Sequence, residues 1–386
     1  MESIVSQIRT MAKNADDVGL LEIQKALRDI QTEIQTPKDI LIEFANSNLI
    51  LATVRLGADL KLFRHLATHN GSLTVSQLAD ITGASSQLLE RVLRYLASIN
   101  VIKEVGFNEY QANTTTHTLA DPKGEAMVYH IFDTHAPSVQ AMPDFFAENG
   151  YRDIDSITNT PFQKAHNTTL SSFDWMVQNP KHFESLQKVM VAFESAEWTA
   201  GFDLFDSEAK KVPSVSPQPS ERPFFVDVGG GHGHQCVQLG KKYPNLLGRL
   251  VLQDLPAAVN QLPPIEGVKA EAHDFFEKQP IAGAKFYYLR RVLHDWPDRE
   301  CSTILQNISD AMSSDSRILI DEVVLPDTGA HWQGTMADIT MMINLGGKER
   351  TVHQWKSLAD SACLRVEEIH TYISSSYTSI VVLAPK

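Results

Sequence analysis

Cysteine is scarce in this chain of 386 residues, which contains only Cys236, Cys301 and Cys363, far apart in the sequence. This spacing forms neither a disulfide framework nor a CxxC metal site, and it is typical of a protein from a reducing compartment. Long apolar runs are also missing, since none reaches the ~18 residues of a membrane span and the first residues lack a signal-peptide core. We therefore expect a cytoplasmic protein without a membrane partner.

Basic residues are too few to balance the acidic ones: 34 Lys and Arg stand against 47 Asp and Glu, a net charge of -13 at pH 7. A nucleic-acid backbone is bound by a basic surface, so this balance argues against a nucleic-acid partner. The length allows two domains, or one large domain with an appendage.

The most informative stretch is FFVDVGGGHGH at residues 224–234, where an apolar run with strand character meets a glycine cluster and then a helical pattern. Glycines allow positive φ angles and let a ligand approach the backbone closely. The order Asp227, Gly229, Gly231, Gly233 reads D-x-G-x-G-x-G and differs from the dinucleotide pattern G-x-G-x-x-G. It resembles motif I of S-adenosylmethionine-dependent methyltransferases. A plain glycine-rich turn between strand and helix is the alternative.

Two further acids follow at the ends of the next apolar segments. Asp254, followed by Leu255, lies 25 residues beyond Gly229, about the length of one strand-helix-strand unit, where a carboxylate can accept hydrogen bonds from both ribose hydroxyls. Asp274 and Phe275 follow a third apolar segment and suit the amino group and the ring face of adenine. Together these features predict a nucleoside-binding edge.

The N-terminal part is predicted to be helical. Apolar residues at three- and four-residue intervals between Leu20 and Ile34 predict a helix over residues 14–35 that stops before Pro37. The stripe is too narrow for a buried helix and indicates docking onto another surface, such as a second subunit. A second helical pattern covers residues 39–69.

Residues 73–96 have the outline of a helix-turn-helix, with Thr74 as an N-cap, and residues 99–112 suggest a β-hairpin. The whole is shaped like a winged helix. DNA binding is disfavoured, because the second helix offers only Arg91 and Arg94 within an acidic chain.

The middle of the chain, residues 120–205, is helical and rich in aromatic residues and methionine, including Phe173 and Met176. Such residues are more often core than ligand contacts, but this region could cover a substrate. Residues 211–222 are rich in Pro and Ser and predict a mobile surface loop. After them, strands at 224–228, 249–253, 285–289, 317–321 and 379–383 alternate with helical patterns, as in a doubly wound α/β sheet.

His294 follows one of these strands, and ligands of open α/β sheets bind at the carboxyl ends of strands. An imidazole there can take a proton from a phenol or enol hydroxyl, whose oxyanion then attacks the methyl group of a sulfonium. Such a base needs partners that orient its ring, and Glu322 and Glu349 are the candidates.

HDWPD at 294–298, an Asp-Glu pair after a hydrophobic strand, and GGKERT at 346–351 occur in this order after motif I. With these motifs the chain resembles the plant caffeate-type and fungal O-methyltransferases over nearly its whole length. The resemblance implies a Rossmann-like methyltransferase sheet, an α-helical, winged-helix-like N-terminal dimerisation domain, S-adenosylmethionine as cofactor, no metal, and a homodimer. The expected parts are residues 1–120 for dimerisation, 121–210 for lining the substrate, the loop 211–222, and the catalytic domain 223–386.

The candidate site residues form three groups. The catalytic group is His294 as general base with Glu322 and Glu349. The cofactor group is Asp227, Gly229, Gly231, Asp254, Leu255, Asp274, Phe275 and Arg290. The substrate group is Asp295, Met341, Met342, Asn344, Phe173 and Met176.

The acceptor stays open beyond a largely apolar molecule, because residues 120–200 diverge from the plant pattern. A rival function is also open: some fungal proteins of this fold act as pericyclases or dehydratases that bind S-adenosylmethionine without transferring its methyl group. In such a protein the histidine of HDW is expected to be replaced, and here His294 is present.

Overall fold

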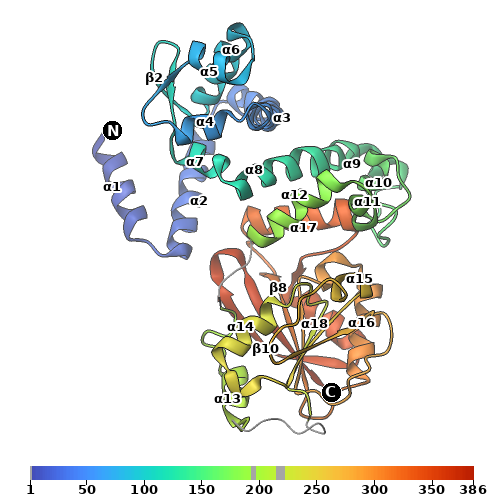
Figure 1. Cartoon of the computed structure of the whole chain (residues 1–386). Coiled ribbons are helices and arrows are strands. Elements are labelled where there is room, and N and C mark those ends of the chain that lie inside the picture. The colour runs from blue at the N-terminus through green and yellow to red at the C-terminus, as the bar shows by residue number, and fades with distance from the viewer. Residues whose placement is uncertain (1, 193–196, 214–221) are drawn as a thin grey trace. The chain divides into compact units, whose positions relative to one another are not determined.

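The computed structural model describes residues 2–192, 197–213 and 222–386, which divide into two compact units. The first unit comprises residues 1–143 and 162–194, and the second comprises 144–161 and 195–386 (Figure 1). The predicted loop 211–222 falls mainly on residues 214–221, outside the described residues. The domain boundaries expected at 120, 210 and 222 stay predictions.

The first unit is mainly helical. Its helices are α1 (Glu2–Asn14), α2 (Asp17–Ile34), α3 (Pro37–Asp59), α4 (Leu62–Thr68), α5 (Val75–Thr82), α6 (Ser86–Ser98), α7 (Thr114–Ala120), α8 (Pro122–Tyr129), a π-helix η1 (His130–His135), α9 (Ala136–Glu148), α10 (Pro161–His166), α11 (Ser172–Gln178) and α12 (Pro180–Ala192). α9 runs into the second unit after Pro143.

The helix predicted over 14–35 is present as α2, and the helix predicted over 39–69 is interrupted. Asp16 accepts a hydrogen bond from the amide of Gly19 and so begins α2 at Asp17, which separates it from α1. The predicted helix over 39–69 divides into α3 and α4 at Lys61, whose φ of 52° is left-handed. Thr36 and Asp39 form a capping box that starts α3.

The predicted winged-helix shape is present. Thr74 caps α5 by accepting from the amide of Gln77, and α6 follows after Gly83. Strands β1 (Leu73–Thr74), β2 (Lys103–Gly106) and β3 (Glu109–Gln111) pair antiparallel in the order β1-β3-β2. A core that includes Leu78, Leu93 and Tyr110 holds these elements together.

By length and mean hydropathy, α3 is apolar enough to cross a membrane, and only 11% of its most apolar 18-residue window is buried in the unit. Its sequence does not stand out as an uninterrupted apolar run, because Glu43, Asn46 and Arg55 interrupt it. Leu41 and Phe44 on this helix are 71% and 73% exposed. The helix therefore presents apolar surface that the unit leaves uncovered.

The second unit is built on one sheet with the strand order β10-β11-β8-β7-β4-β5-β6, and β9 pairs with β8. Its strands are β4 (Phe225–Val228), β5 (Leu250–Asp254), β6 (Val268–Ala272), β7 (Phe286–Arg290), β8 (Arg317–Leu325), β9 (Arg350–Thr351), β10 (Leu364–Ile373) and β11 (Thr378–Pro385). β11 is antiparallel to both of its neighbours, whereas β4 to β8 pair in parallel. All five predicted strands are present, and the predicted α/β methyltransferase fold is confirmed.

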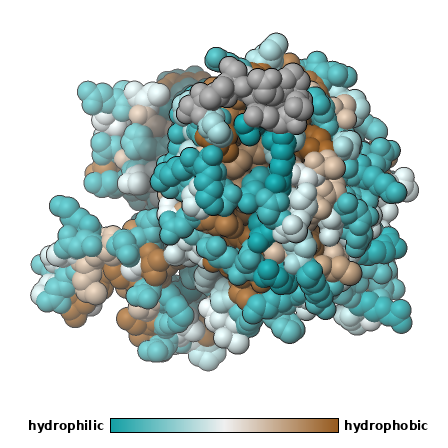
Figure 2. Space-filling view, turned by 90° about the horizontal axis from the view of Figure 1, so that it is seen from below, coloured by the Kyte–Doolittle hydropathy of each residue, from teal (hydrophilic) through white to brown (hydrophobic). Residues whose placement is uncertain are grey.

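Helices cover both faces of this sheet (Figure 1). One core joins the sheet to α16 (Asp298–Ser309) and α18 (Val352–Ser361), and the other joins it to α13 (Asp203–Lys211) and α14 (His234–Lys242). α15 (Pro256–Val259), α17 (Trp332–Leu345) and the single turns η2 (Pro244–Leu246), η3 (Leu293–Asp295) and η4 (Ser374–Ser376) complete the unit. The face in Figure 2 is mostly hydrophilic, with apolar side chains in separate patches.

The strand order reverses beside β4. From β4 the chain first builds the sheet to one side with β5 and β6, and then returns to the other side of β4 with β7 and β8. In open α/β sheets, ligands bind at the carboxyl ends of strands where the order reverses in this way. The glycine cluster follows β4 and His294 follows β7, so the topology brings both to this edge.

Candidate active site

The glycine cluster forms the turn from β4 to α14. Gly229, Gly231 and Gly233 all have positive φ. At Gly231 the φ of 53° would strain most other residues, and a Cβ there would project into open space with no atom within 4 Å. A ligand can therefore approach the backbone at this glycine, as motif I predicts.

Asp254 closes this turn from the end of β5. Its Oδ2 accepts from the amide of Gly231 at 2.8 Å and its Oδ1 from the amide of Leu255 at 2.7 Å. Each carboxylate oxygen has a second lone pair, so both can still accept a ribose hydroxyl. The side chain of Leu255 is 51% exposed beside it. These residues fit the nucleoside part of S-adenosylmethionine.

Asp274 and Phe275 follow β6. Asp274 Oδ1 accepts from the amide of Phe276 at 2.9 Å. The ring of Phe275 lies 3.8 Å from the position that a Cβ of Gly229 would occupy, and it packs edge-on against Phe276 and Trp296. An aromatic face thus lies beside the glycine turn, as adenine recognition requires.

Asp227, predicted to contact the cofactor, lies beneath the turn and is only 1% exposed. A Cβ on Gly230 would come within 2.6 Å of its Cγ, and the thiol of Cys236 donates to its Oδ2 at 3.8 Å. Burial raises the pKa of Asp227 to about 7, opposed by the charge of Arg290. Its contacts here support the glycine turn from below.

Arg290 ends β7 and is paired with a buried acid. Its Nη1 lies 3.3 Å from Oδ2 of Asp321. The same oxygen accepts from the hydroxyl of Tyr288 at 2.6 Å, and Oδ1 of Asp321 accepts from the hydroxyl of Tyr372 at 2.7 Å. The pKa of Arg290 is raised despite its burial, by the negative groups around it. The cation therefore remains charged at the strand end, where its predicted role is to contact the cofactor.

His294 lies in the turn η3 after β7, and Glu322 organises the backbone of this turn. Glu322 Oε1 accepts from the amides of Leu293 at 2.7 Å and of Val292 and His294 at 3.2 Å. These hydrogen bonds go to the backbone of the turn and not to the imidazole, so the expected part of Glu322 in orienting the ring stays a prediction. Burial raises the pKa of Glu322 to about 7.

Glu349 is the glutamate that holds the imidazole ring. Its Oε1 lies 2.9 Å from His294 Nδ1, and Glu349 is 3% exposed. Although burial raises the pKa of Glu349, the charge of His294 brings it below its usual range. An ionised carboxylate only accepts hydrogen bonds, so Nδ1 carries the hydrogen. The neutral ring then has its lone pair on Nε2.

Asp295, predicted on the substrate side, places its Oδ1 3.4 Å from Nε2 of His294. Burial lowers the pKa of His294, but the charges of Glu349 and then Asp295 outweigh it and raise the pKa to about 9. Protonation of the imidazole is therefore favoured at pH 7, because both ring nitrogens lie next to carboxylates. Burial raises the pKa of Asp295 to about 6.

The segment that carries Glu349 touches the His294 turn directly. The amide of Lys348 donates to the carbonyl of His294 at 2.9 Å. A Cβ on Gly347 would lie 1.9 Å from the same oxygen, so only glycine permits this approach. Asp338 on α17 accepts from the amide of Glu349 at 3.0 Å. Asp338 was not among the residues predicted from the sequence. The sequence indicates it only by its position on α17, one turn before the predicted substrate residue Met341.

The predicted substrate residues lie in both units. Met341, Met342 and Asn344 are on α17, where Asn344 is 4% exposed and donates to the carbonyl of Thr340 at 2.9 Å. Phe173, 39% exposed, and Met176, 4% exposed, are on α11 of the first unit. Their assignment to one substrate site stays a prediction.

The first unit also gathers His130, His135, His166 and His182. The rings of His130 and His135 are 4.3 Å apart, and His166 Nε2 contacts the carbonyl of Thr134 at 3.0 Å. Burial lowers the pKa of His130 to about 4 and that of His135 to about 3. These two imidazoles are neutral at pH 7 and pack as part of the helical core.

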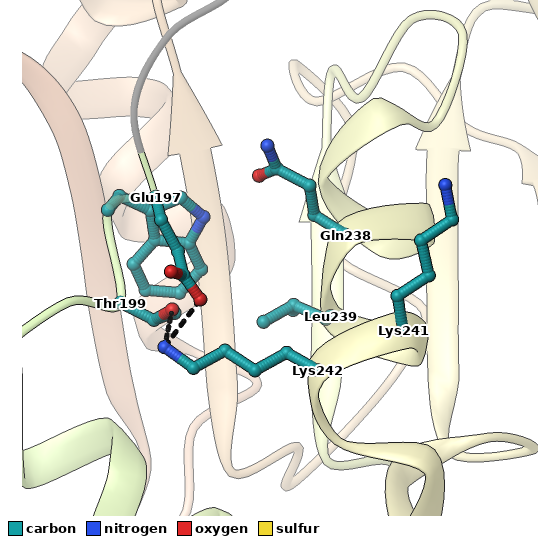
Figure 3. Close-up of a pocket in the computed structure, with 7 residues that line it drawn as sticks. Glu197, Thr199, Gln238, Leu239, Lys241 and Lys242 are labelled. Atoms are coloured by element: carbon teal, nitrogen blue, oxygen red, sulfur yellow. Dashed lines mark hydrogen bonds and ion pairs between the residues drawn. The ribbon is translucent and has the colours of Figure 1, made fainter.

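A hollow of about 420 Å³ lies between Glu197 and Thr199 on one side and Lys241 and Lys242 on the other (Figure 3). Lys242 Nζ pairs with Glu197 at 2.6 Å and donates to Thr199 at 2.8 Å. None of the predicted site residues lines it. Lys242 is already paired with Glu197, so we assign this hollow no part in the chemistry.

The chain belongs to the O-methyltransferase family. A model of the O-methyltransferase domain matches residues 218–365, and a model of the O-methyltransferase dimerisation domain matches residues 42–120. It is therefore an enzyme of the S-adenosylmethionine-dependent class, and S-adenosylmethionine is its cofactor.

Among individual relatives, the chain is 39% identical over its whole length to demethylsterigmatocystin 6-O-methyltransferase of Aspergillus flavus, of which it covers 98%. It matches the structure of LepI in complex with S-adenosylmethionine with a TM-score of 0.90 at 36% identity, over all of this chain and 98% of that one. A structure described as a pericyclic reaction enzyme matches with a TM-score of 0.89 at 36% identity, over all of this chain and 99% of that one.

Proposed function

We propose that this enzyme transfers a methyl group to a phenol or enol hydroxyl of an apolar secondary metabolite, with His294 as general base. The observation that carries the proposal is the 2.9 Å contact between His294 Nδ1 and Glu349, at the sheet edge that also carries the glycine turn. This contact selects the tautomer whose lone pair is on Nε2. Nε2 is the atom that would take the proton of the acceptor.

The cofactor supplies an electrophilic methyl group when it is bound. The turn of Gly229 to Gly233, with Asp254, would hold its nucleoside part, and Phe275 would lie against its ring. His294 removes the hydroxyl proton, and Asp295, 3.4 Å from Nε2, stabilises the imidazolium that forms. Glu322 keeps the backbone of the turn in place.

A second function, cofactor-assisted pericyclic or dehydrating chemistry, has two observations in its favour. The chain is 36% identical to a structure described as a pericyclic reaction enzyme. The raised pKa of about 9 also makes His294 a hydrogen-bond donor at pH 7, which suits the polarisation of a carbonyl. The intact pair of His294 and Glu349 favours methyl transfer.

Product analysis with two cofactors separates these functions. Pure protein is incubated with S-adenosylmethionine and a panel of phenols and enols, while S-adenosylhomocysteine is measured. Methyl transfer predicts one S-adenosylhomocysteine per product and no product with sinefungin, a cationic analogue that has no transferable methyl group. Full product formation with sinefungin would replace our proposal by the pericyclic function.

We further propose that the enzyme is a homodimer whose interface includes α1, α2 and α3. Neither α1 nor α2 has a buried residue, and Ile30 and Ile34 of α2 are 52% and 77% exposed. The dimerisation-domain match at residues 42–120 begins within α3. A second copy would cover these apolar side chains.

Deleting residues 1–36 is expected to convert the dimer into monomer or aggregate, because part of this interface is lost or exposed. Light scattering measures the mass. The point variant Ile34→Lys should weaken the dimer, whereas Thr32→Lys, which adds the same charge on the same helix, serves as the control. A mass of one chain for the full-length protein would contradict the proposal.

A further inference from the structure

Arg350, next to Glu349, is a fully buried cation that the mechanism above does not use. Its side chain is 0% exposed, and its main counter-ion is Asp298 at the start of α16, whose Oδ1 lies 2.7 Å from Nη2 and 2.9 Å from Nε. Burying a guanidinium is costly, and an apolar residue of similar size often gives equal or greater stability. The role of Arg350 is therefore better explained by the geometry of the groups that it binds than by a gain in stability.

The guanidinium holds the His294 turn from its carbonyl side. Nη1 donates to the carbonyl of Leu293 at 3.0 Å, and Nη2 donates to the carbonyl of Trp296 at 3.1 Å. These carbonyls flank His294 and Asp295 in the chain. The thiol of Cys301, 3.2 Å from Nη2, donates to the same two carbonyls at 3.1 and 3.3 Å.

Glu322 binds the amides of the same turn, so the turn lies between an anion at its amides and a cation at its carbonyls. The planar fork of arginine can reach two carbonyls and a carboxylate together, which the ammonium of lysine cannot do in one fixed geometry. Because Arg350 directly follows Glu349, the cation fastens the strand that carries Glu349 to the turn that carries His294.

We propose that Arg350 is a positioning residue that keeps the His294 turn and Glu349 in register, so that Glu349 orients the imidazole. For turnover this rests on the proposed function, but the orientation of His294 can be measured without any turnover. Loss of Arg350 frees two carbonyls and the link between the His294 turn and the strand that carries Glu349. The contact of Glu349 with Nδ1 then loosens, and His294 loses part of the negative charge that raises its pKa.

The test uses Arg350→Met and Arg350→Lys in the full-length protein, with Arg299→Lys on the exposed side of α16 as the matched control. NMR of ¹³C-labelled histidine gives the His294 titration, assigned by its loss in His294→Gln. We expect the pKa of His294 to fall by about one unit or more in Arg350→Met, and by less in Arg350→Lys. The control should titrate like the wild type.

Where the wild type turns over an acceptor, Arg350→Met should lower kcat by about 10²-fold with little change in cofactor affinity, because the base is misplaced by a fraction of its contact distance. A folded Arg350→Met protein with an unchanged or raised pKa of His294 overturns the proposal, because loss of the cation without loss of the Glu349 contact would not lower that pKa. If that variant does not fold, Arg350→Lys and Asp298→Asn decide by the same measurement, since the side chain of Asp298 is 56% exposed. A shifted titration without any S-adenosylhomocysteine release would support the positioning role and reject the methyl-transfer function.

Discussion

Replacing His294 with alanine is expected to lower the turnover of methyl transfer by about 10²- to 10⁴-fold, the usual contribution of a positioned general base. Affinity for S-adenosylmethionine should stay nearly unchanged, because the predicted cofactor contacts come from the glycine turn, Asp254 and Phe275. Steady-state kinetics and calorimetry measure the two quantities. His353→Ala, on the exposed surface of α18, is the control variant.

The pH dependence gives this prediction a second readout. The base must be neutral to accept a proton, and the carboxylates of Glu349 and Asp295 hold the pKa of His294 at about 9. For the wild type, kcat/KM, which reports the free enzyme, should therefore rise from pH 7, reach half of its maximum near pH 9 and level off above it. In His294→Ala this rise should disappear for ordinary acceptors, and only an acidic phenol, which ionises in solution, should regain part of its activity at high pH. A flat wild-type profile would argue against His294 as the base.

Losing Glu322 or Glu349 should cost less turnover than losing His294, because neither handles the proton. The contacts separate the two glutamates. Glu349→Gln should lower the pKa of His294, since it removes the charge next to Nδ1. Glu322→Gln keeps an acceptor for the three amides of the turn and should leave the ring in place.

Replacing Asp254 with alanine should weaken the binding of S-adenosylmethionine by about 2 to 4 kcal/mol, because two hydrogen bonds to a charged acceptor are lost. Part of this loss comes from the amide of Gly231, which donates to Asp254 at 2.8 Å and would lose its partner. Asp254→Asn keeps an acceptor without the charge and should lie between wild type and alanine. Titration calorimetry measures the series.

Asp310→Ala, at the exposed end of α16, is the matched control and should bind the cofactor as the wild type does. If Asp254→Ala binds S-adenosylmethionine as tightly as the wild type does, the end of β5 does not bind the nucleoside. The two sets of variants separate chemistry from binding. His294→Ala should lower the rate at constant cofactor affinity, whereas Asp254→Ala should mainly weaken the binding of the cofactor.

Local patterns in the sequence determined much of this protein. The five predicted strands, the winged-helix outline with its Thr74 cap, and the glycine turn with Asp254 are all present in the structure. Each depends on residues close in the chain or on the regular length of a strand-helix-strand unit, so propensity and spacing suffice to find them. The helix over 39–69 was predicted too long, because the left-handed residue Lys61 interrupts an otherwise continuous pattern.

Only the tertiary structure decided what each charged side chain of the site touches. Glu322 is 28 residues from His294 and Glu349 is 55, and nothing in the sequence shows that the first binds backbone amides while the second binds the ring. The local sequence does not show what Arg350 and Asp338 bind, because their partners come from other segments of the chain. Strand order and side-chain direction select among such partners, and the two carboxylates that they bring to His294 raise its pKa against the effect of burial.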